Sequence, residues 1–407
     1  MKGALQGAQS KKDVLAAQLA AELSTMIDVE LLLDKTVSFA RLLSFAEAGT
    51  IYLLEEGKLR FATSQNDYLA RSVGEEDELP FMGYNLNLDQ TTLAGYAASQ
   101  MEILTVNDTY NIDSNAPYQH FKIIDTTSNY FSRAIMSIPL TTFAGELMGV
   151  LQVINPLDAK GNVGEFSSSD EKAIFFIAQS AAMSLEKALL LRSSVTLTVQ
   201  LLAAVDPMET TGHVQRVAYM SAEIYSHWAA KNKVPNSERD EIKDVLPLAT
   251  MLHDVGKCWI PKEIFTKPGR LDVNERAIME GHVLAGAKLF SKANSPLERL
   301  TKTLIMDHHE RWDGRGYPGN ILKEKGEQGA KGKKGEEISI YGRILAIADV
   351  YDALCNRKTY KEPFDESLST QMLDQERGYH FDPDVVDCFM SIQPTLSKIM
   401  KRYPEPE

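Results

Sequence analysis

The sequence is poor in cysteine and has no excess of positive charge. Its three cysteines, at positions 258, 355 and 388, are isolated from one another, which excludes a disulfide framework and a Cys-x-x-Cys metal site and favours a reducing compartment. Lys and Arg number 43 against 56 Asp and Glu, for a net charge of −13. This balance excludes a nonspecific nucleic-acid binder, because a phosphate backbone requires a basic surface.

Long apolar segments are also missing. No stretch reaches about 18 uncharged apolar residues, and the N-terminus lacks the apolar core of a signal, so we expect a cytoplasmic protein with no membrane span. What is present is typical of a globular protein, with 44% hydrophobic and 24% charged residues, and 407 residues suffice for two or three domains. Seven of the eight histidines follow residue 168, which indicates different roles for the two halves.

The first 167 residues contain short apolar or alternating runs separated by Gly, Asn and Asp. The expected strands are "GTIYLLEE" (49–56), "KLRFATS" (58–64), "RAIMSIPL" (133–140) and "ELMGVLQVIN" (146–155). Helical patterns occupy 12–24, 29–44 and a segment near 91–99. This order predicts an α+β domain on an antiparallel sheet.

Residues 25–187 resemble a GAF sensor domain. The resemblance is carried by "MSIPL", "GELMGVLQVIN" and "GEFSSSDEKAIFFIAQSAAMSLEKA". GAF domains that bind cyclic nucleotides share a signature matched here at Asn155, Phe166, Asp170 and Glu171, but Pro156 stands where they have lysine. The resemblance implies a small-molecule ligand whose identity the sequence leaves open.

A long linker helix is expected over 168–205, because serines at 167–169 can cap it and acids follow in its first turn. Apolar residues recur along it in steps of four and three, as in a helical seam. The positions are 174, 178, 181, 185, 188, 192, 195, 199 and 202, and only Arg192 among them is polar. The helix either packs on its own domain or joins two copies, and we predict a homodimer.

The remaining residues, 206–407, show helical patterns in which imidazoles and carboxylates interrupt apolar surroundings. These side chains are Glu209, His213, His253, Asp254, His282, His308, His309 and Asp349. Glu209 and His213 have the spacing of one helical face, His282 is expected in mid-helix, and the paired histidines end an apolar helix before "GRGYPG". A buried acid without a partner is costly, and a shared metal site accounts for all eight groups together.

Eight donors are too many for one ion, which takes about four to eight ligands. With bridging carboxylates, water and substrate oxygens, they suffice for two or three divalent ions, and we favour three. Imidazole and carboxylate without thiolate suit iron or manganese, with zinc, cobalt and nickel as alternatives.

Residues 200–400 resemble an HD-GYP phosphodiesterase, a branch of the HD hydrolases. The matching motifs are "HDVGK" (253–257), "HHERWDGRGYPG" (308–319), "RILAIADVYDAL" (343–354) and "GYHFDPDVVDCF" (378–389). The resemblance implies an all-α domain that hydrolyses cyclic di-GMP to pGpG or GMP with two or three metal ions. It places all eight donors on ligand positions, with Asp254 as the bridge.

The catalytic residues implied are Asp254 and Lys257, whose ammonium would face the phosphate or the leaving group. Substrate contacts are expected from Lys257 and Tyr317 and from the basic segment "NRKTYK" at Arg357, Lys358 and Lys361. Lys358 stands where the family commonly has Arg, and a lysine is a point charge rather than a bidentate fork. A second departure is the Gly- and Lys-rich insertion 323–337, which we expect to be mobile.

Several other polar side chains in this sequence are expected to be structural. They are His120, His227, Asp352 and His380, whereas Trp312 either contacts a guanine or packs its turn.

We therefore expect an N-terminal helix (1–24), a GAF-like domain (25–167), a linker helix (168–205) and an HD-GYP domain (206–407). The expected function is GAF-regulated hydrolysis of cyclic di-GMP. The alternatives are hydrolysis of another cyclic dinucleotide, such as hybrid cyclic GMP-AMP, and a non-catalytic adaptor that responds to cyclic di-GMP.

Overall fold

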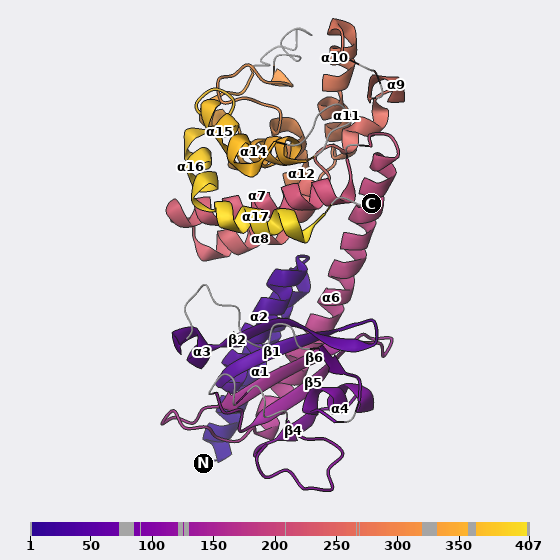
Figure 1. The fold of residues 1–407 in the computed structure, drawn as a ribbon. Helices are drawn as coiled ribbons and strands as arrows, with labels where there is room; N and C mark the ends of the chain where they lie inside the picture. Colours follow the sequence, from indigo (N-terminus) through magenta and orange to yellow (C-terminus); the bar gives the residue numbers. More distant parts are fainter. Residues whose placement is uncertain are drawn as a thin grey trace. The chain divides into compact units, whose positions relative to one another are not determined.

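The computed structural model describes most of the chain, in ten segments. They are residues 2–72, 85–89, 91–120, 125, 130–207, 209–265, 267, 269–319, 332–356 and 364–404. The chain divides into two compact units, Met1–Leu190 and Leu191–Glu407. Figure 1 labels their helices and strands.

The first unit is built on one six-stranded sheet with the strand order β3-β2-β1-β6-β5-β4. The strands are β1 (Ala46–Glu55), β2 (Lys58–Asn66), β3 (Asn85–Asn87), β4 (Leu104–Val106), β5 (Ile135–Thr141) and β6 (Leu147–Pro156). All neighbouring strands are antiparallel. Glu56 and Gly57 connect β1 to β2 with φ angles of 50° and 76°, as a two-residue type I′ hairpin requires.

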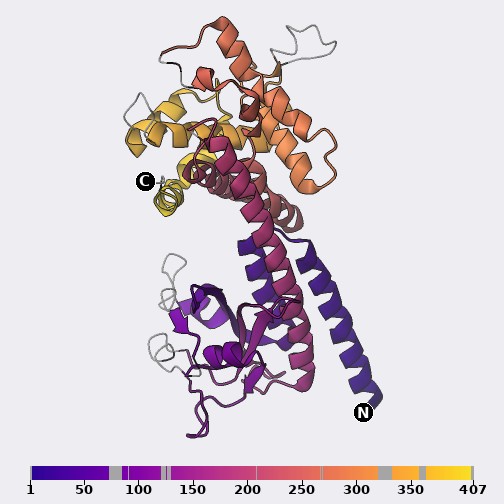
Figure 2. The same ribbon diagram turned by 90° about the vertical axis from the view of Figure 1, so that its right-hand side faces the viewer.

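Helices cover both faces of this sheet (Figures 1 and 2). On one face lie α1 (Lys2–Thr25), α2 (Val29–Ser44) and the first part of α6 (Ser168–Ala203), and on the other lies α4 (Leu93–Gln100). A short helix, α3 (Asp67–Ser72), follows β2. The main core joins Val37, Ile138, Leu151 and Ile174 from four different elements. The α+β fold expected from the sequence is confirmed.

The long helix α6 corrects one expectation. Its predicted seam is turned inward: Ile174, Ala178 and Leu185 belong to the core of the first unit, and Val195 and Val199 are also buried. The interpretation that this face packs on its own chain is therefore the right one, and the face is not available to a second copy. The outward apolar residues of α6 are instead Phe175, Phe176, Met183, Leu189, Leu190, Leu197 and Leu201.

Length and composition alone would also allow α6 to cross a membrane. An 18-residue window in it has a mean hydropathy of 1.5, and 44% of that window is buried within the protein. A single helix of this kind is weak evidence for a membrane span, because a core helix has the same composition.

The described residues of the second unit form helices and no strand. After the end of α6 come α7 (Thr211–Lys231), α8 (Asn236–Met251), η1 (Val255–Trp259), α9 (Lys262–Phe265), α10 (Val273–Glu280), α11 (His282–Leu289), α12 (Pro296–Asp307), η2 (Gly335–Glu337), α14 (Ile340–Cys355), α15 (Glu366–Gln375), α16 (Pro383–Ser391) and α17 (Gln393–Arg402). Helices α7, α8, α12 and α14 each pack against two of the others and so close a ring, while α11 packs against η1 and α12. The mostly helical C-terminal fold is also confirmed.

Candidate metal centre

Helix ends in this ring bring the predicted donors together. His213 lies in the first turn of α7, whose N-cap Thr210 accepts a hydrogen bond from the His213 amide. His253 and Asp254 form the turn between α8 and η1, and His308 caps the end of α12. These positions follow from local sequence, because the apolar runs that form the helices stop there.

Two local expectations are wrong. Glu209 precedes the N-cap of α7 and so does not share a helical face with His213, although their Oε2 and Nε2 atoms are 4.0 Å apart. His282 begins α11 rather than lying in mid-helix, because the chain turns at Gly281 between α10 and α11.

Three imidazoles have their orientation fixed by backbone carbonyls. Nδ1 of His253 donates to the Thr250 carbonyl (2.7 Å), that of His282 to Met279 (2.8 Å), and that of His308 to Leu304 and Ile305 (both 3.0 Å). A carbonyl can only accept, so Nδ1 carries a proton in each ring and Nε2 is the nitrogen left to face a metal. This is the usual arrangement of metal-binding histidine.

The Asp254 carboxylate lies where the donors converge. Its Oδ1 is 3.0 Å from Nε2 of His282 and 3.3 Å from Nε2 of His308, and its Oδ2 is 3.4 Å from Nε2 of His253. The donors form two groups with metal-ligand spacing. One contains Asp254, His282, His308 and His309, and the other contains Glu209, His213 and His253. Asp254 faces both groups, as expected of a bridging carboxylate.

Asp349, on α14, lies outside both groups. Its Oδ1 is 3.6 Å from Nε2 of His213, so it borders the group that contains Glu209. Seven of the eight predicted donors therefore fall into the two groups, and the eighth is adjacent.

Several donor atoms are buried and have no hydrogen-bond partner. They are Oε2 of Glu209, Oδ1 of Asp254 and Nε2 of His253, His282 and His308. Leaving a buried polar atom unpaired costs about 1–3 kcal/mol, more for a charged group. Five such atoms in one place, all of them nitrogen or oxygen ligands, fit bound divalent cations.

The two donor groups differ in the pKa values of their histidines. Burial disfavours a charged imidazole, but the Asp352 hydrogen bond and the Glu209 charge outweigh it and raise the pKa of His213 to about 9. Asp254 likewise raises the pKa of His253 to about 9 against the effect of burial. Burial lowers the pKa of His308 and His309. A cation entering the group with Glu209 must therefore displace protons, whereas His308 and His309 are neutral donors at pH 7.

Lys257 contributes a cation to the same place. Its Nζ is 2.5 Å from Oε1 of Glu209, 2.8 Å from Oδ2 of Asp254 and 3.0 Å from Oδ2 of Asp206. Burial disfavours the ammonium, but these three carboxylates outweigh it and raise the pKa of Lys257 well above its usual value. Asp206 was not predicted from the sequence. The only available signal was a second acid three residues before Glu209.

Asp352 contacts one of the predicted donors, His213, from the side away from the other donors of its group. Its Oδ2 accepts from Nδ1 of His213 at 2.8 Å, and its carboxylate also pairs with the buried guanidinium of Arg216 (2.5 and 3.0 Å). Arg216 in turn donates to the Tyr403 carbonyl at 2.7 Å. Asp352 thus holds a predicted metal ligand, a contact that the sequence did not predict.

The predicted substrate contacts are only partly described. The Tyr317 ring stacks on His309, with centroids 4.5 Å apart, and packs beside Val255, Val283 and Ile305. Trp312 lies under the Arg343 guanidinium, 5.7 Å from its ring centroid. Arg357, Lys358 and Lys361 lie outside the described residues.

The insertion 323–337 is described only from residue 332 onward. There Lys333 pairs with the buried Asp307, at 2.5 Å, and η2 follows. Two other histidines have protein partners: His227 is hydrogen-bonded to Ser391 (2.9 Å), and the His380 ring stacks on Phe381.

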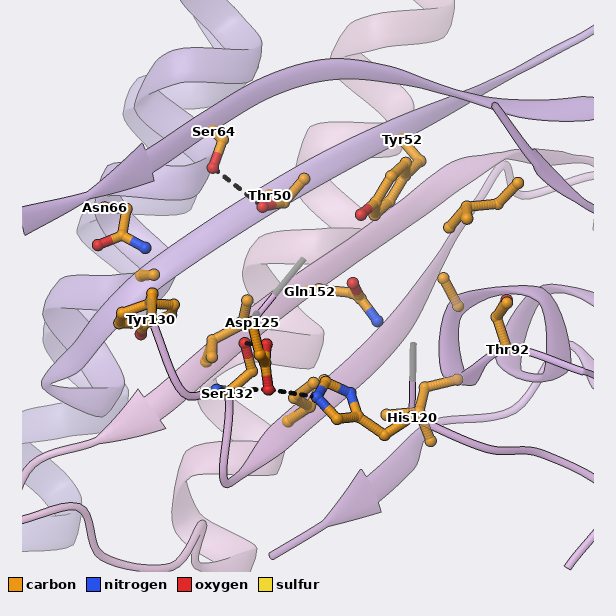
Figure 3. A pocket seen from close by; sticks show the side chains of 16 residues that line it. Thr50, Tyr52, Ser64, Asn66, Thr92, His120, Asp125, Tyr130, Ser132 and Gln152 are labelled. Carbon is orange, nitrogen blue, oxygen red and sulfur yellow. Dashed lines mark hydrogen bonds and ion pairs between the residues drawn. The ribbon is translucent and has the colours of Figure 1, made fainter. Parts of the chain in front are cut away.

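The first unit has a separate cavity of about 80 Å³ between the sheet and α4 (Figure 3). Thr50 and Ser64, 3.0 Å apart, line it from two strands, and His120 pairs with the buried Asp125 at its edge (2.7 Å). No lysine or arginine among the described residues lines this cavity. The part of the lining that is described therefore offers no lysine or arginine to a phosphate group.

Two known domain families match this chain, one in each unit. Residues 28–185 match the GAF domain family, and residues 198–385 match the HD domain family. A 3′3′-cGAMP-specific phosphodiesterase 2 of Vibrio cholerae is 39% identical over 182 residues, which cover 45% of this chain and 31% of that protein.

Two further relatives are also named phosphodiesterases and match about half of this chain. A probable cyclic di-GMP phosphodiesterase of Vibrio cholerae is 33% identical over 223 residues, covering 53% of this chain and 48% of that protein. A cyclic di-GMP phosphodiesterase of Thermotoga maritima is 32% identical over 195 residues, covering 48% of each. The chain thus spans less than half the length of these relatives.

Proposed function

We propose that this chain, which carries a GAF domain followed by an HD domain, is a metal-dependent phosphodiesterase of the HD-GYP type that hydrolyses cyclic di-GMP. The observation that supports this most is the cluster of buried, unpaired donor atoms around Asp254. The names of two relatives that match about half of this chain point to the same chemistry.

The donor set supports two ions and leaves room for a third. Asp254, His282, His308 and His309 make one group, and Glu209, His213 and His253, with Asp349 beside them, make the other. We propose three ions of iron or manganese, because eight side chains exceed the needs of two when a bridging carboxylate, water and substrate oxygens complete the ligands. When bound, such ions activate a water and stabilise the phosphate charge.

The protein's own groups have distinct tasks in this proposal. Asp254 holds the two groups at a fixed separation through its two oxygens. Lys257 keeps a positive charge beside them, where negative charge develops on a phosphate or a leaving oxygen. Burial and the Asp254 charge raise the pKa of Tyr317, so its hydroxyl stays protonated and can donate a hydrogen bond to substrate. Arg357, Lys358 and Lys361 are proposed phosphate contacts.

A second substrate has specific support. The relative with 39% identity is named as specific for 3′3′-cGAMP, so hydrolysis of that hybrid dinucleotide is the alternative within the same chemistry. A non-catalytic adaptor would bind cyclic di-GMP without cleaving it.

The test is turnover by the purified chain. Loaded anaerobically with Fe²⁺ or Mn²⁺, it should convert cyclic di-GMP to pGpG or GMP faster than it cleaves 3′3′-cGAMP, with products separated by chromatography. His308→Ala should abolish turnover, whereas His227→Ala, which removes only a contact to Ser391, should preserve it. Binding without cleavage under every metal condition would exclude the enzyme.

Regulation and assembly are proposed more broadly. The GAF domain would control the HD domain by binding a small ligand, and the protein would act as a cytoplasmic homodimer. Because the cavity in Figure 3 has no cationic lining residue among those described, an uncharged ligand fits it better than a cyclic nucleotide.

A further inference from the structure

Asp206 is a buried carboxylate beside the metal centre that belongs to neither donor group. Its side chain is 6% exposed, and its Oδ2 lies 3.0 Å from the Lys257 ammonium, whose side chain is 15% exposed. The backbone holds it there: the Asp206 amide donates to Leu202 (2.9 Å), and the Asp206 carbonyl accepts from the Glu209 amide (3.0 Å). This turn directs Asp206 and Glu209 to the same lysine.

Lys257 is shared between metal donors and a carboxylate that is not one of them. Glu209 contacts Nζ through Oε1, while its Oε2 is unpaired and faces His213. Asp254 contacts Nζ through Oδ2, while its Oδ1 faces His282 and His308. An ion in either group would therefore share a carboxylate with the lysine.

Two cations that share carboxylates repel each other, and in a buried site the repulsion is weakly screened. Without Asp206, Lys257 would keep Glu209 and Asp254 as its carboxylate partners among the described residues, and it would compete with the ions for both. Asp206 adds a third negative charge beside the lysine.

We propose that Asp206 is a positioning residue: it holds and neutralises the Lys257 ammonium and thereby permits the Glu209, His213 and His253 group to bind its ion. The inference rests on the proposed function only in that the two groups bind metal. It assigns Asp206 no contact with ion or substrate, and its effect must pass through Lys257.

The test is a double-mutant cycle on the full chain, with Mn²⁺ binding measured by equilibrium dialysis and elemental analysis. Asp206→Asn should weaken the weakest-bound Mn²⁺ at least tenfold, and so lower the count by about one ion per chain at limiting metal. Lys257→Met should bind Mn²⁺ at least as tightly as wild type, because the competing cation is gone. In the Lys257→Met background, Asp206→Asn should change Mn²⁺ affinity less than threefold.

Two outcomes would overturn the inference. Unchanged Mn²⁺ binding by Asp206→Asn would show that the lysine needs no third carboxylate. An equal loss in both backgrounds would show that Asp206 acts directly on the ion or on the fold. Asp206→Glu, which retains the charge, should restore Mn²⁺ affinity if the inference holds, and a failure to do so would contradict it.

These failures are distinct from failure of the proposed function. If the wild-type chain binds no Mn²⁺ and His308→Ala changes nothing, the metal centre itself is wrong and the role of Asp206 falls with it. If wild type binds Mn²⁺ and Asp206→Asn binds it equally well, only the role of Asp206 is overturned.

Discussion

At the residue scale, the centre depends on side chains that hold its ligands. Asp352 fixes His213 and neutralises Arg216, which is 1% exposed. Asp352→Asn removes the carboxylate that pairs with that guanidinium and loosens His213. We expect a loss of about 3 kcal/mol in the free energy of unfolding and a loss of about 10- to 100-fold in Mn²⁺ affinity, from denaturant titration and metal binding.

The matched control breaks another buried ion pair. Asp382 pairs with Arg343 at 2.5 Å, and neither belongs to the donor groups. Asp382→Asn should lower stability and leave Mn²⁺ affinity unchanged, and it keeps a good N-cap for α16. If both variants lose Mn²⁺ equally, the effect of Asp352 comes from the fold as a whole.

His380 should make the fold sensitive to acid. Burial and the Arg311 charge lower its pKa from 6.5 to about 4. Between these values the unfolded chain binds a proton that the folded chain does not, so stability falls as the pH drops from about 6.5 to about 4. The fall is on the order of 2 kcal/mol for this partly buried group. In urea titrations, the free energy of unfolding of His380→Gln should fall less between pH 7 and pH 4.5 than that of wild type. An equal fall would show that His380 does not cause the acid sensitivity.

At the element scale, α6 has two faces with different roles. Leu185 is 1% exposed and lies in the core, whereas Leu190 is 65% exposed. Leu185→Glu should lower the free energy of unfolding by more than about 3 kcal/mol, because a charge enters an apolar core. Leu190→Glu should change it by less than about 0.5 kcal/mol.

The same pair tests the proposed homodimer by sedimentation. A dimer that uses the outward face of α6 should shift toward monomer in Leu190→Glu, with its thermal unfolding unchanged. If Leu185→Glu instead dissociates a dimer without loss of stability, the inward seam would be the interface after all.

At the scale of the whole molecule, the two units have separate cores and only one holds the donors. Calorimetry should therefore show two unfolding transitions, and Mn²⁺ should raise the midpoint of one, because an ion stabilises the structure that binds it. Ile138→Ala, in the core of the first unit, should lower the free energy of unfolding of that unit by about 2–5 kcal/mol. It should therefore lower the midpoint of the transition that Mn²⁺ leaves unchanged. If Mn²⁺ moves both transitions equally, the units unfold together.

The sequence by itself determined the local structure of both units. The apolar runs became β1, β5 and β6, whose successive residues are buried because helices cover both faces of the sheet, and β2 is an edge-ward strand with fewer buried residues. Gly57 marks the turn between β1 and β2. The donors could be selected individually, because a histidine or an acid that interrupts an apolar helical pattern is costly to bury unless it binds a partner. Seven of them meet in two groups.

Only the tertiary structure decided which faces and which distant partners these elements take. The periodicity of α6 showed an apolar stripe, but the sheet and α2 determined that this stripe is core. Asp206 and Asp352 were not identified as partners of the centre, because Lys257 and His213 lie 51 and 139 positions away along the chain. Periodicity constrains neighbours within a helix, whereas contacts at such separations arise only when helices pack.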